Sequence, residues 1–295
     1  MGEKVGRVSA LWRFPVKSML GEPVDQAVLT EQGVVGDRGY AVVDEETGKV
    51  VSAKSARLFP GMFECRATFA EEPRAGMPLP PVMVALPDGS RVTSDRPDCD
   101  DILSAHFGRR VHLASAASEG YTIDQYHPDV EGADPAGYRD TVVEMKLGSA
   151  FFDDIGVPSP VAPTAFFDLF PVSVLTSSTL ATLGTLRPQS RFDARRFRMN
   201  VIVDTEPDGF LENEWIGLHV GLGEEARVHV VMPDPRCVMP TLAQEELPRD
   251  NDVLRTLVRH NRLELEGGAR FPCAGVYVVV EASGHVRQGD VVTTS

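Results

Sequence analysis

A cysteine stands beside an arginine in residues 230–242, VVMPDPRCVMPTL. Pro233 and Pro235 are not expected to continue a central strand together, because proline has no backbone N–H for a sheet. We therefore expect Cys237 in the loop just after a strand, where binding and catalytic residues often lie. The charge of Arg236 favours a thiolate, the form that attacks electrophiles and binds metals. A buried thiol without a chemical role is the alternative interpretation.

Arginines are concentrated in residues 191–200, RFDARRFRMN, within a chain that is otherwise acidic. If this stretch is a strand, Arg198 and Asn200 point to the same face, because side chains two positions apart share a face. A guanidinium beside an amide suits a phosphate or another planar anion. A surface stripe of arginines paired with acidic neighbours explains the spacing equally well, so both interpretations stay open.

Three shorter stretches contain weaker candidates. Lys17 in FPVKSM and Arg38 in GDRGY each place a cation in or next to a predicted turn. Thr176 and Thr179, in VLTSSTL, lie at the expected start of a helix, where hydroxyls cap the helix or help to bind phosphate. Each residue alone is also explained as an ordinary exposed or capping side chain.

Composition restricts the classes of function. The chain has 295 residues, of which 42% are hydrophobic and 24% charged, as is usual for soluble proteins of one or two domains. Its 29 basic and 43 acidic residues give a net charge of -14, which argues against nucleic acid or an anionic membrane as a partner. No secretory signal and no membrane-spanning apolar run are present, so we expect a cytoplasmic protein.

Several familiar catalytic motifs are absent from the sequence. It contains no GxGxxG, P-loop, HExxH or GxSxG pattern. The four cysteines are far apart and form no CxxC pair, so we expect reduced thiols and neither a zinc knuckle nor a clustered iron–sulfur site. The seven histidines show no metal-ligand spacing, and we expect most of them to be surface or packing residues.

The first third of the chain is typical of a small barrel or a strongly bent sheet, because short strands alternate with turns. Residues 39–53 are a hairpin candidate with a turn at 45–48, and residues 82–94 are a second with a turn at 87–89. Asp98 is expected to cap a short helix that Gly108 ends.

Residues 116–165 are rich in turn formers and poor in periodicity, so we expect a connection or an insertion there. A second β-rich unit follows. Ser177 is expected to cap a helix that Gly184 closes, and residues 250–261 form an amphipathic helix. The strongest strands are expected at residues 197–204, 225–232 and 274–282.

Taken in order, these stretches resemble the MOSC family, the molybdenum-cofactor sulfurase C-terminal domain. FPVKS and GDRGY resemble the N-terminal β-barrel domain that precedes MOSC domains. Five later stretches resemble the MOSC domain itself: FPVSVLTSSTLATL, RRFRMNVIVD, FLENEWIG, PRCVMPTL and CAGVYVVVEASGHVRQGDVV. The resemblance implies a mainly β fold with some α: an N-terminal β-barrel-like domain at residues 1–115 and a MOSC β-barrel with a few helices at 116–295.

The resemblance also implies a site. In relatives that reduce amidoximes, a molybdenum cofactor (Mo-molybdopterin) lies between the two domains and a cysteine ligates the metal. Carried over, Cys237 is the metal ligand and the catalytic residue. The cofactor-binding residues that the resemblance implies are Lys17, Arg38, Thr176, Thr179, Arg198, Asn200 and Arg236.

The implied reaction is a two-electron reduction of N-oxygenated, N-hydroxylated small molecules, with oxygen-atom abstraction at the cysteine-ligated molybdenum. The chain contains no cluster-binding cysteines, so a separate reductase or ferredoxin is expected to donate the electrons. Residues 240–243 depart from the Thr-Thr-x-Asp that often follows the cysteine in relatives. The alternative function is a carrier, with a persulfide on Cys237 or with the cofactor bound for delivery elsewhere.

Overall fold

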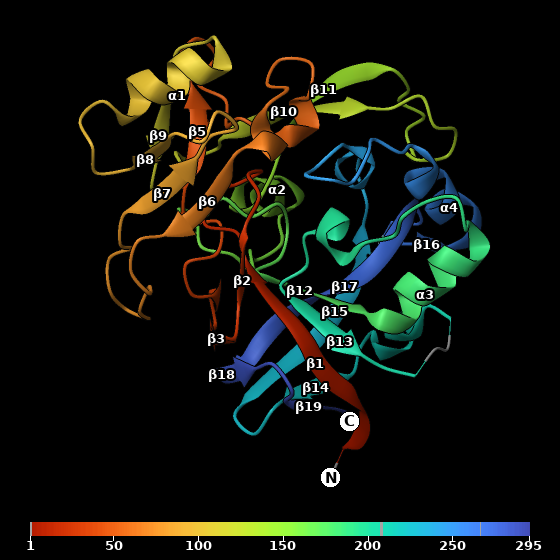
Figure 1. Ribbon diagram of the computed structural model, residues 1–295. Coiled ribbons are helices and arrows are strands. Elements are labelled where there is room, and N and C mark those ends of the chain that lie inside the picture. The colour runs from red at the N-terminus through yellow and green to blue at the C-terminus, as the bar shows by residue number, and fades with distance from the viewer. Residues whose placement is uncertain (1, 207–208, 266) are drawn as a thin grey trace.

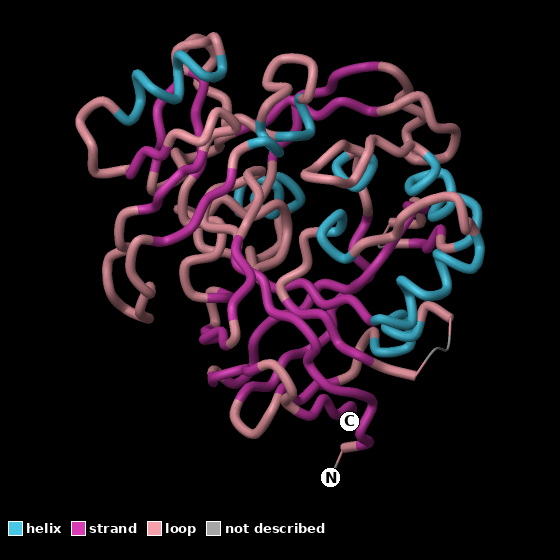
Figure 2. The backbone as a smooth tube through the Cα atoms, viewed as in Figure 1, coloured by secondary structure: helices cyan, strands magenta, loops and turns pink. Residues whose placement is uncertain are grey.

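A computed structural model of the chain describes residues 2–206, 209–265 and 267–295, and strands dominate it (Figures 1 and 2). The described residues contain four α-helices, and the predicted class, mainly β with some α, is confirmed. The helices are α1 (Cys99–Phe107), α2 (Ser149–Ile155), α3 (Ser177–Leu186) and α4 (Asp252–His260).

A closed barrel forms the C-terminal unit. Its strands follow the spatial order β12, β13, β1, β19, β14, β15 and β17, and β17 pairs back with β12 to close the ring. Closure leaves no exposed edge within the ring. The strands are β1 (Glu3–Arg13), β12 (Val172–Thr176), β13 (Val201–Asp204), β14 (His219–Leu222), β15 (Ala226–Pro235), β17 (Arg270–Ala282) and β19 (Val291–Thr294), with β2 (Glu22–Val24) and β16 (Arg262–Glu264) attached.

Alternation of side chains explains why these sequences form a barrel. Along β15, Val228 and Val230 are buried inside, whereas His229 between them points outward. Valines of β17 repeat the pattern, with Val276 and Val278 fully buried. Successive side chains of a strand point to opposite faces, so alternate valines fill the interior.

The N-terminal strand β1 belongs to the C-terminal barrel, where it pairs with β13 and β19. A second link is a small sheet in which β18 (Gly284–Arg287) pairs with β3 (Gln26–Thr30), which in turn pairs with β4 (Gly33–Val34). The two units are therefore joined through several strands. The domain boundary at residue 115 stays a prediction. Strand β1 precedes this boundary in the sequence but belongs to the C-terminal barrel.

The N-terminal β unit is built from short sheets around its own core. Strand β5 (Ala41–Asp44) pairs with β9 (Val111–Ala114), and β7 (Val82–Ala85) lies between β6 (Arg66–Phe69) and β8 (Arg91–Thr93). Helix α1 buries Leu103 in this core. Met239, only two residues beyond Cys237, is also part of it, so the chain after the cysteine is anchored in the other unit.

Several predicted elements are confirmed and others are not. The hairpin at residues 82–94 and the end of α1 at Gly108, whose φ is 64°, are as predicted. Asp98 precedes α1, but its carboxylate binds Arg96 and does not cap the helix. The hairpin at residues 39–53 is confirmed with its turn, since Val43 and Val50 form an antiparallel bridge, but its second arm is short and β5 pairs along its length with β9.

Other differences concern where elements begin and end. Thr176, not Ser177, caps α3 by accepting a hydrogen bond from the Thr179 amide, and the helix continues through Gly184 to Leu186. Arg198 precedes strand β13 with a left-handed φ of 56°. The predicted connection at 116–165 contains a hairpin of β10 (Thr122–His127) and β11 (Thr141–Lys146), together with α2.

Strand β15 runs through both Pro233 and Pro235, contrary to the prediction. Pairing with β14 reaches only to His229, so the last part of β15 pairs with β17 alone. The register shifts twice there, between Val230 and Met232 and between the two prolines. Proline is tolerated because an edge and a bulge do not require its missing N–H.

We expect Gly275→Ala to destabilise the barrel. Gly275 has a φ of 80°, and an added Cβ would lie 2.7 Å from the carbonyl oxygen of Val174 and against Met199. The strain of an alanine in the left-handed backbone conformation, together with overpacking, should lower the free energy of unfolding by about 2–4 kcal/mol. Urea unfolding measures the change. Gly217→Ala is the control, because its φ is 83° and no atom lies within 4 Å, so only about 1 kcal/mol should be lost; equal losses would contradict the packing argument.

Candidate active site

A cavity of about 1260 Å³ is lined by residues from both units. It brings together the predicted site residues Lys17, Arg38, Arg198, Asn200, Arg236 and Cys237. Lys17 and Arg38 come from the N-terminal part of the chain, and the others come from the barrel unit. The predicted cluster is therefore a spatial one, although its members are up to 220 positions apart in the sequence.

Thr176 and Thr179 do not line this cavity. Both are fully buried, and both hydroxyls donate to the carboxylate of Glu212, at 2.5 Å from Thr176 and at 2.7 Å from Thr179. The amide of Gly275 donates to the same carboxylate at 3.0 Å. Burial raises the pKa of Glu212, and these donors partly offset that effect. The two threonines therefore join α3 to the barrel and are not placed to hold a cofactor.

Two lysines share one carboxylate at the cavity wall. Lys17 Nζ lies 2.6 Å from Asp168 Oδ1 and 2.7 Å from the carbonyl of Phe166, and Lys54 Nζ lies 3.0 Å from Asp168 Oδ2. Burial lowers the pKa of Lys17 to about 8, despite the attraction of Asp168. Desolvation alone would raise the pKa of Asp168, but the charges of Lys17 and Lys54 hold it well below its usual range.

A second cluster is organised around the ring of Phe14. The guanidinium carbons of Arg38 and Arg198 lie 4.5 and 4.2 Å from the ring centroid. Asp37 pairs with Arg38 and accepts a hydrogen bond at 2.9 Å from Asn200 Nδ2. Arg38 Nη2 also donates to the carbonyl of Arg198 at 3.1 Å. Cation–π and ion-pair contacts thus hold two like charges next to each other.

Arg198 itself has no carboxylate partner among the described residues. Its Nη1 donates to the carbonyl of Met19 at 2.7 Å. Burial and the neighbouring charge of Arg38 lower the pKa of Arg198 to about 9, which leaves the guanidinium charged at neutral pH. Ser18, Arg38 and Arg198 all adopt left-handed backbone conformations, which are rare for such residues and often occur at functional sites.

The third cluster lies at the end of β15, beside Cys237. Arg236 pairs with Asp234, and its Nη2 donates to the carbonyl of Phe197 at 2.6 Å. Its buried Nε has no partner among the described residues. Burial raises the pKa of Asp234 to about 6, although Arg236 opposes the shift. Desolvation and the charge of Asp234 raise the pKa of Tyr277 far above its ordinary value, so the phenol keeps its proton.

Cys237 differs from the other three cysteines. Cys65, Cys99 and Cys273 are buried, and burial raises the pKa of their thiols to about 12, 11 and 12. Cys237 is partly exposed and lines the cavity. Lys54 lines the same cavity as Cys237; burial would lower the pKa of this lysine, but the charge of Asp168 raises it. The inert-thiol interpretation fits the other three cysteines; Cys237 packs partly against the N-terminal core but also reaches the cavity, so its chemical role stays a prediction.

Positive charge is in excess around the cavity. The lining contains six cations and four carboxylates: Lys17, Arg38, Lys54, Lys146, Arg198 and Arg236 against Asp134, Asp168, Asp234 and Glu264. Asp37, which pairs with Arg38 at the edge of the cavity lining, reduces the excess to one positive charge. In a chain whose net charge is -14, this excess is local. Guanidinium and ammonium groups with donors still free are suited to phosphate and other anions. The cavity is therefore suited to an anionic ligand that reaches Cys237.

Sequence reasoning missed Lys54, Asp168 and Tyr277. Asp168 had a signal, because it is the one carboxylate in the apolar run FFDLF, and a charged residue there requires a partner. Tyr277 lies within a strand predicted correctly, but nothing in the sequence places it against Asp234. Lys54, in SAKSAR, has the pattern of an ordinary exposed lysine, and only the fold brings it to Asp168.

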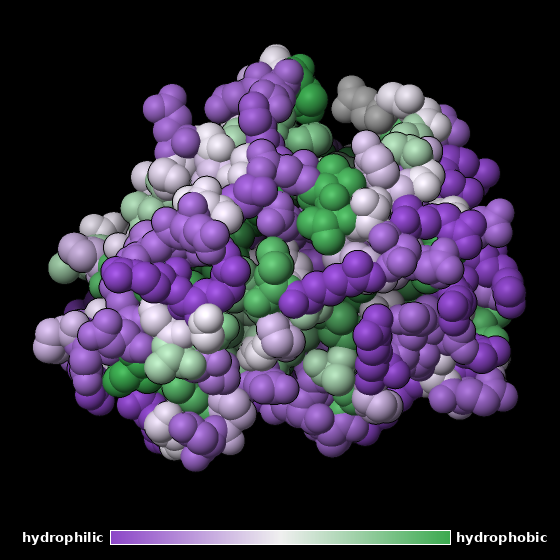
Figure 3. Space-filling view, turned by 90° about the horizontal axis from the view of Figure 1, so that it is seen from above, coloured by the Kyte–Doolittle hydropathy of each residue, from purple (hydrophilic) through white to green (hydrophobic). Residues whose placement is uncertain are grey.

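Part of the cavity wall, named here the apolar outer wall, is rich in apolar side chains and includes the exposed Ile155 and Val157. Residues 116–165 contribute much of it, with Met145, Leu147, Phe151, Phe152 and Ile155 among the lining side chains. Hydrophobic side chains gather toward the middle of the face seen from above in Figure 3, and hydrophilic ones surround them. The predicted insertion therefore shapes the cavity. Across the described residues, no helix has the length and hydropathy to cross a bilayer.

Family models match both units: the MOSC N-terminal beta barrel domain at residues 5–95 and the MOSC domain at residues 163–293. The chain belongs to the MOSC domain family. MOSC domains are associated with binding of the molybdenum cofactor, and the matched ranges contain every predicted site residue.

Curated relatives of this MOSC protein match over nearly its whole length. Mitochondrial amidoxime reducing component 2 of Homo sapiens is 26% identical, covering 98% of this chain and 84% of the human protein. Mitochondrial amidoxime-reducing component 1 of Xenopus laevis is 28% identical, covering 98% and 82%. Among solved structures, the YuaD protein from Bacillus subtilis aligns with a TM-score of 0.44 at 13% identity, covering 100% of this chain and 98% of that one.

We expect Asp168→Asn to destabilise the MOSC protein, because Lys17 and Lys54 would lose their shared counter-charge. The side chain of Asp168 is 33% exposed, so the loss should be about 2–3 kcal/mol, below that for a fully buried pair. Since the pKa of Asp168 is depressed, its stabilisation is present above its unfolded pKa of about 4 and lost below it. The difference in the free energy of unfolding between variant and wild type, measured with urea, should therefore shrink below about pH 4.

Asp129→Asn is the control for this measurement. Asp129 pairs with Arg139 at the surface, where the side chains are 66% and 49% exposed, so its loss should stay below about 1 kcal/mol. If both variants unfold alike, the shared carboxylate does not stabilise the cavity wall.

Proposed function

We propose that this MOSC protein is a molybdenum-cofactor-dependent oxidoreductase that reduces N-oxygenated, N-hydroxylated small molecules. One observation carries the proposal: the partly exposed Cys237 lies in a large cavity with an excess of positive charge. The matched relatives, named amidoxime-reducing components, support the substrate class. The apolar outer wall supports a substrate with a hydrophobic body.

The residues present fit the cofactor. A phosphate-bearing pterin requires cations and hydrogen-bond donors, which Lys17, Arg38, Arg198 and Arg236 provide, and the unpaired Nε of Arg236 is one such donor. The Asn200 amide lines the cavity but already donates to Asp37 and to the carbonyl of Trp12, so its part is to position Asp37. The Cys237 thiolate suits a soft metal. When bound, the cofactor supplies the metal centre that delivers two electrons for cleavage of the N–O bond.

The remaining requirement is protons. Reduction of an N-hydroxyl compound consumes two electrons and two protons, breaks the N–O bond and releases the amine or amidine with water. The Asp234 carboxyl, whose pKa is about 6, holds a proton at an oxygen close to the end of β15 and exchanges it near neutral pH. Tyr277 keeps the phenol proton and stays neutral beside it.

A sulfur or cofactor carrier is the second candidate, because a partly exposed cysteine among cations also suits a persulfide. A persulfide carrier does not need a cavity of about 1260 Å³ with an apolar wall, which favours the enzyme. The electron donor in our proposal is a separate reductase or ferredoxin. Four free cysteines support a reducing compartment, for which we propose the cytoplasm.

We expect Cys237→Ser to abolish benzamidoxime reduction with an artificial electron donor, while the fold is kept. Protein from a cofactor-competent host should contain about one molybdenum per chain, and the variant should lose most of it because a hydroxyl is a poor substitute for a thiolate. Cys99→Ser is the matched control, since Cys99 is buried in the N-terminal core and does not line the cavity. Persulfide on Cys237 without molybdenum would establish the carrier instead.

Lys17 should make cofactor retention depend on pH. Its pKa is about 8, so the side chain loses its charge, and its attraction for an anion, as pH rises above 8. Between pH 7 and pH 9 we expect retention to weaken by about tenfold, as for one lost ionic contact. Molybdenum per chain after dialysis at each pH measures it. Lys17→Arg stays charged and should flatten the profile; identical profiles would exclude Lys17 as the titrating group.

A further inference from the structure

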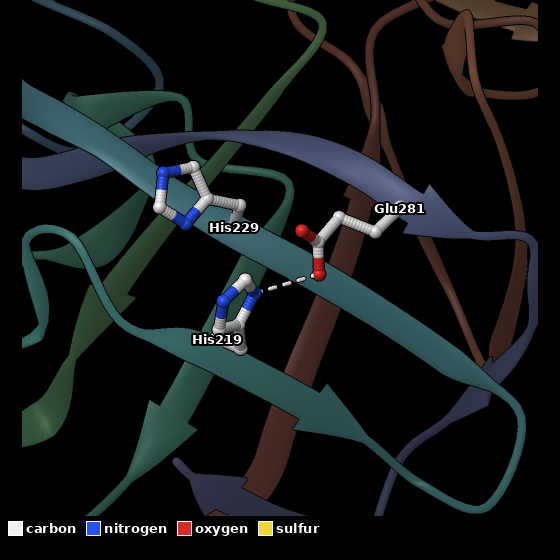
Figure 4. Close-up of side chains that lie close together, drawn as sticks. All are labelled: His219, His229 and Glu281. Carbon is white, nitrogen blue, oxygen red and sulfur yellow. Dashed lines mark hydrogen bonds and ion pairs between the residues drawn. The ribbon is translucent and has the colours of Figure 1, made fainter.

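Three potential metal ligands lie together on the outer face of the barrel, and none of them lines the cavity that contains Cys237. His219, His229 and Glu281 project from β14, β15 and β17, which are neighbours in the barrel (Figure 4). His219 and His229 are direct cross-strand partners, so the backbone itself holds their Cβ atoms close. The sequence offered no metal-ligand spacing for histidines because 10 and 52 residues separate the three in the chain. Strand pairing brings them together.

The distances suit one small cation. One potential ligand atom from each residue lies within 4.8 Å of the others. His219 Nδ1 is 2.8 Å from Glu281 Oε2, and the two imidazole centroids are 5.1 Å apart. Bonds of about 2.1 Å to a tetrahedral zinc ion place donor atoms about 3.4 Å from each other. Modest side-chain rotations therefore reach that geometry without movement of the strands.

His229 provides an independent indication of a ligand. Its Nδ1 is buried and has no hydrogen-bond partner among the described residues. A buried polar atom left without a partner costs free energy, and a metal ion would satisfy it. One cation competes for the same carboxylate: Arg227 Nε lies 3.4 Å from Glu281 Oε2, but its side chain is 61% exposed and free to turn away.

We propose that His219, His229 and Glu281 bind a divalent transition-metal ion, with Zn²⁺ the best fit. Two imidazoles and one carboxylate are ligands that zinc accepts, whereas calcium and magnesium prefer oxygen alone. Three protein ligands leave one coordination position open to water or to an added ligand. The ion would cross-link three barrel strands.

The site borders the wall of the main cavity. Val231 follows His229 by two positions on β15, and Val279 precedes Glu281 by two on β17, so each pair shares the outer face. Both valines line the cavity. A metal here would stiffen β15, which ends two residues before Cys237, independently of whether the molybdenum cofactor is bound.

Zinc titration of the EDTA-treated full-length chain tests the proposal. Isothermal titration calorimetry at pH 7.5 in a non-chelating buffer should show a zinc site that His229→Gln and Glu281→Gln each weaken by roughly tenfold or more. His285→Gln is the matched control, because that ring also pairs with a glutamate, Glu225 at 3.1 Å, but belongs to no three-ligand group among the described residues. Its titration should match that of the wild type.

Cobalt distinguishes this site from the cavity thiol. Co²⁺ bound by the two histidines and Glu281 should show visible ligand-field bands without a thiolate-to-cobalt charge-transfer band. Zinc should also raise the Tm of the wild type and not that of His229→Gln. The proposal is overturned by a thiolate band from the tightest site, by equal zinc affinity in wild type and His229→Gln, or by an equal loss in the His285→Gln control.

Discussion

The enclosure of several cations around one cavity is the constraint on which the site depends. Charges removed from water require partners, and like charges held close together require more of them. Asp168 is placed between two lysines, Asp37 pairs with Arg38, and Asp234 with Arg236. The ring of Phe14 makes cation–π contacts with the guanidinium groups of Arg38 and Arg198. These partners leave positive charge in excess, so an anion is the ligand that the cavity is suited to bind.

The barrel makes this arrangement rigid. Strand β1 is part of the closed ring, so the segment after it, with Lys17 and Arg38, starts from a fixed position. On the other side, β15 ends at Pro235, and Met239 is anchored in the N-terminal core. Cys237 lies between these two attachments. Residues on packed elements hold a site more precisely than residues on free loops.

The family-model matches and much of the apolar cavity wall lie in different parts of the molecule. The MOSC ranges, residues 5–95 and 163–293, contain the cysteine and the lining cations other than Lys146. Much of the apolar outer wall comes from the segment between those ranges, through β10, β11 and α2. These cations and the cysteine therefore lie within the ranges that the family models match, and much of the apolar wall lies outside them.

Local patterns in the sequence determined the mainly β class, the hairpin at 82–94, helix α1 and its end at Gly108, and Cys237 with its arginines as the residues of interest. Turn chemistry, capping and alternation act within a few residues, so a sequence expresses them directly. Tertiary structure alone decided that Thr176 and Thr179 bind Glu212, that β15 accepts two prolines, and that Lys54 meets Asp168. It also placed His219 and His229 beside Glu281. Each of these depends on contacts between segments far apart in the chain, which no local spacing records.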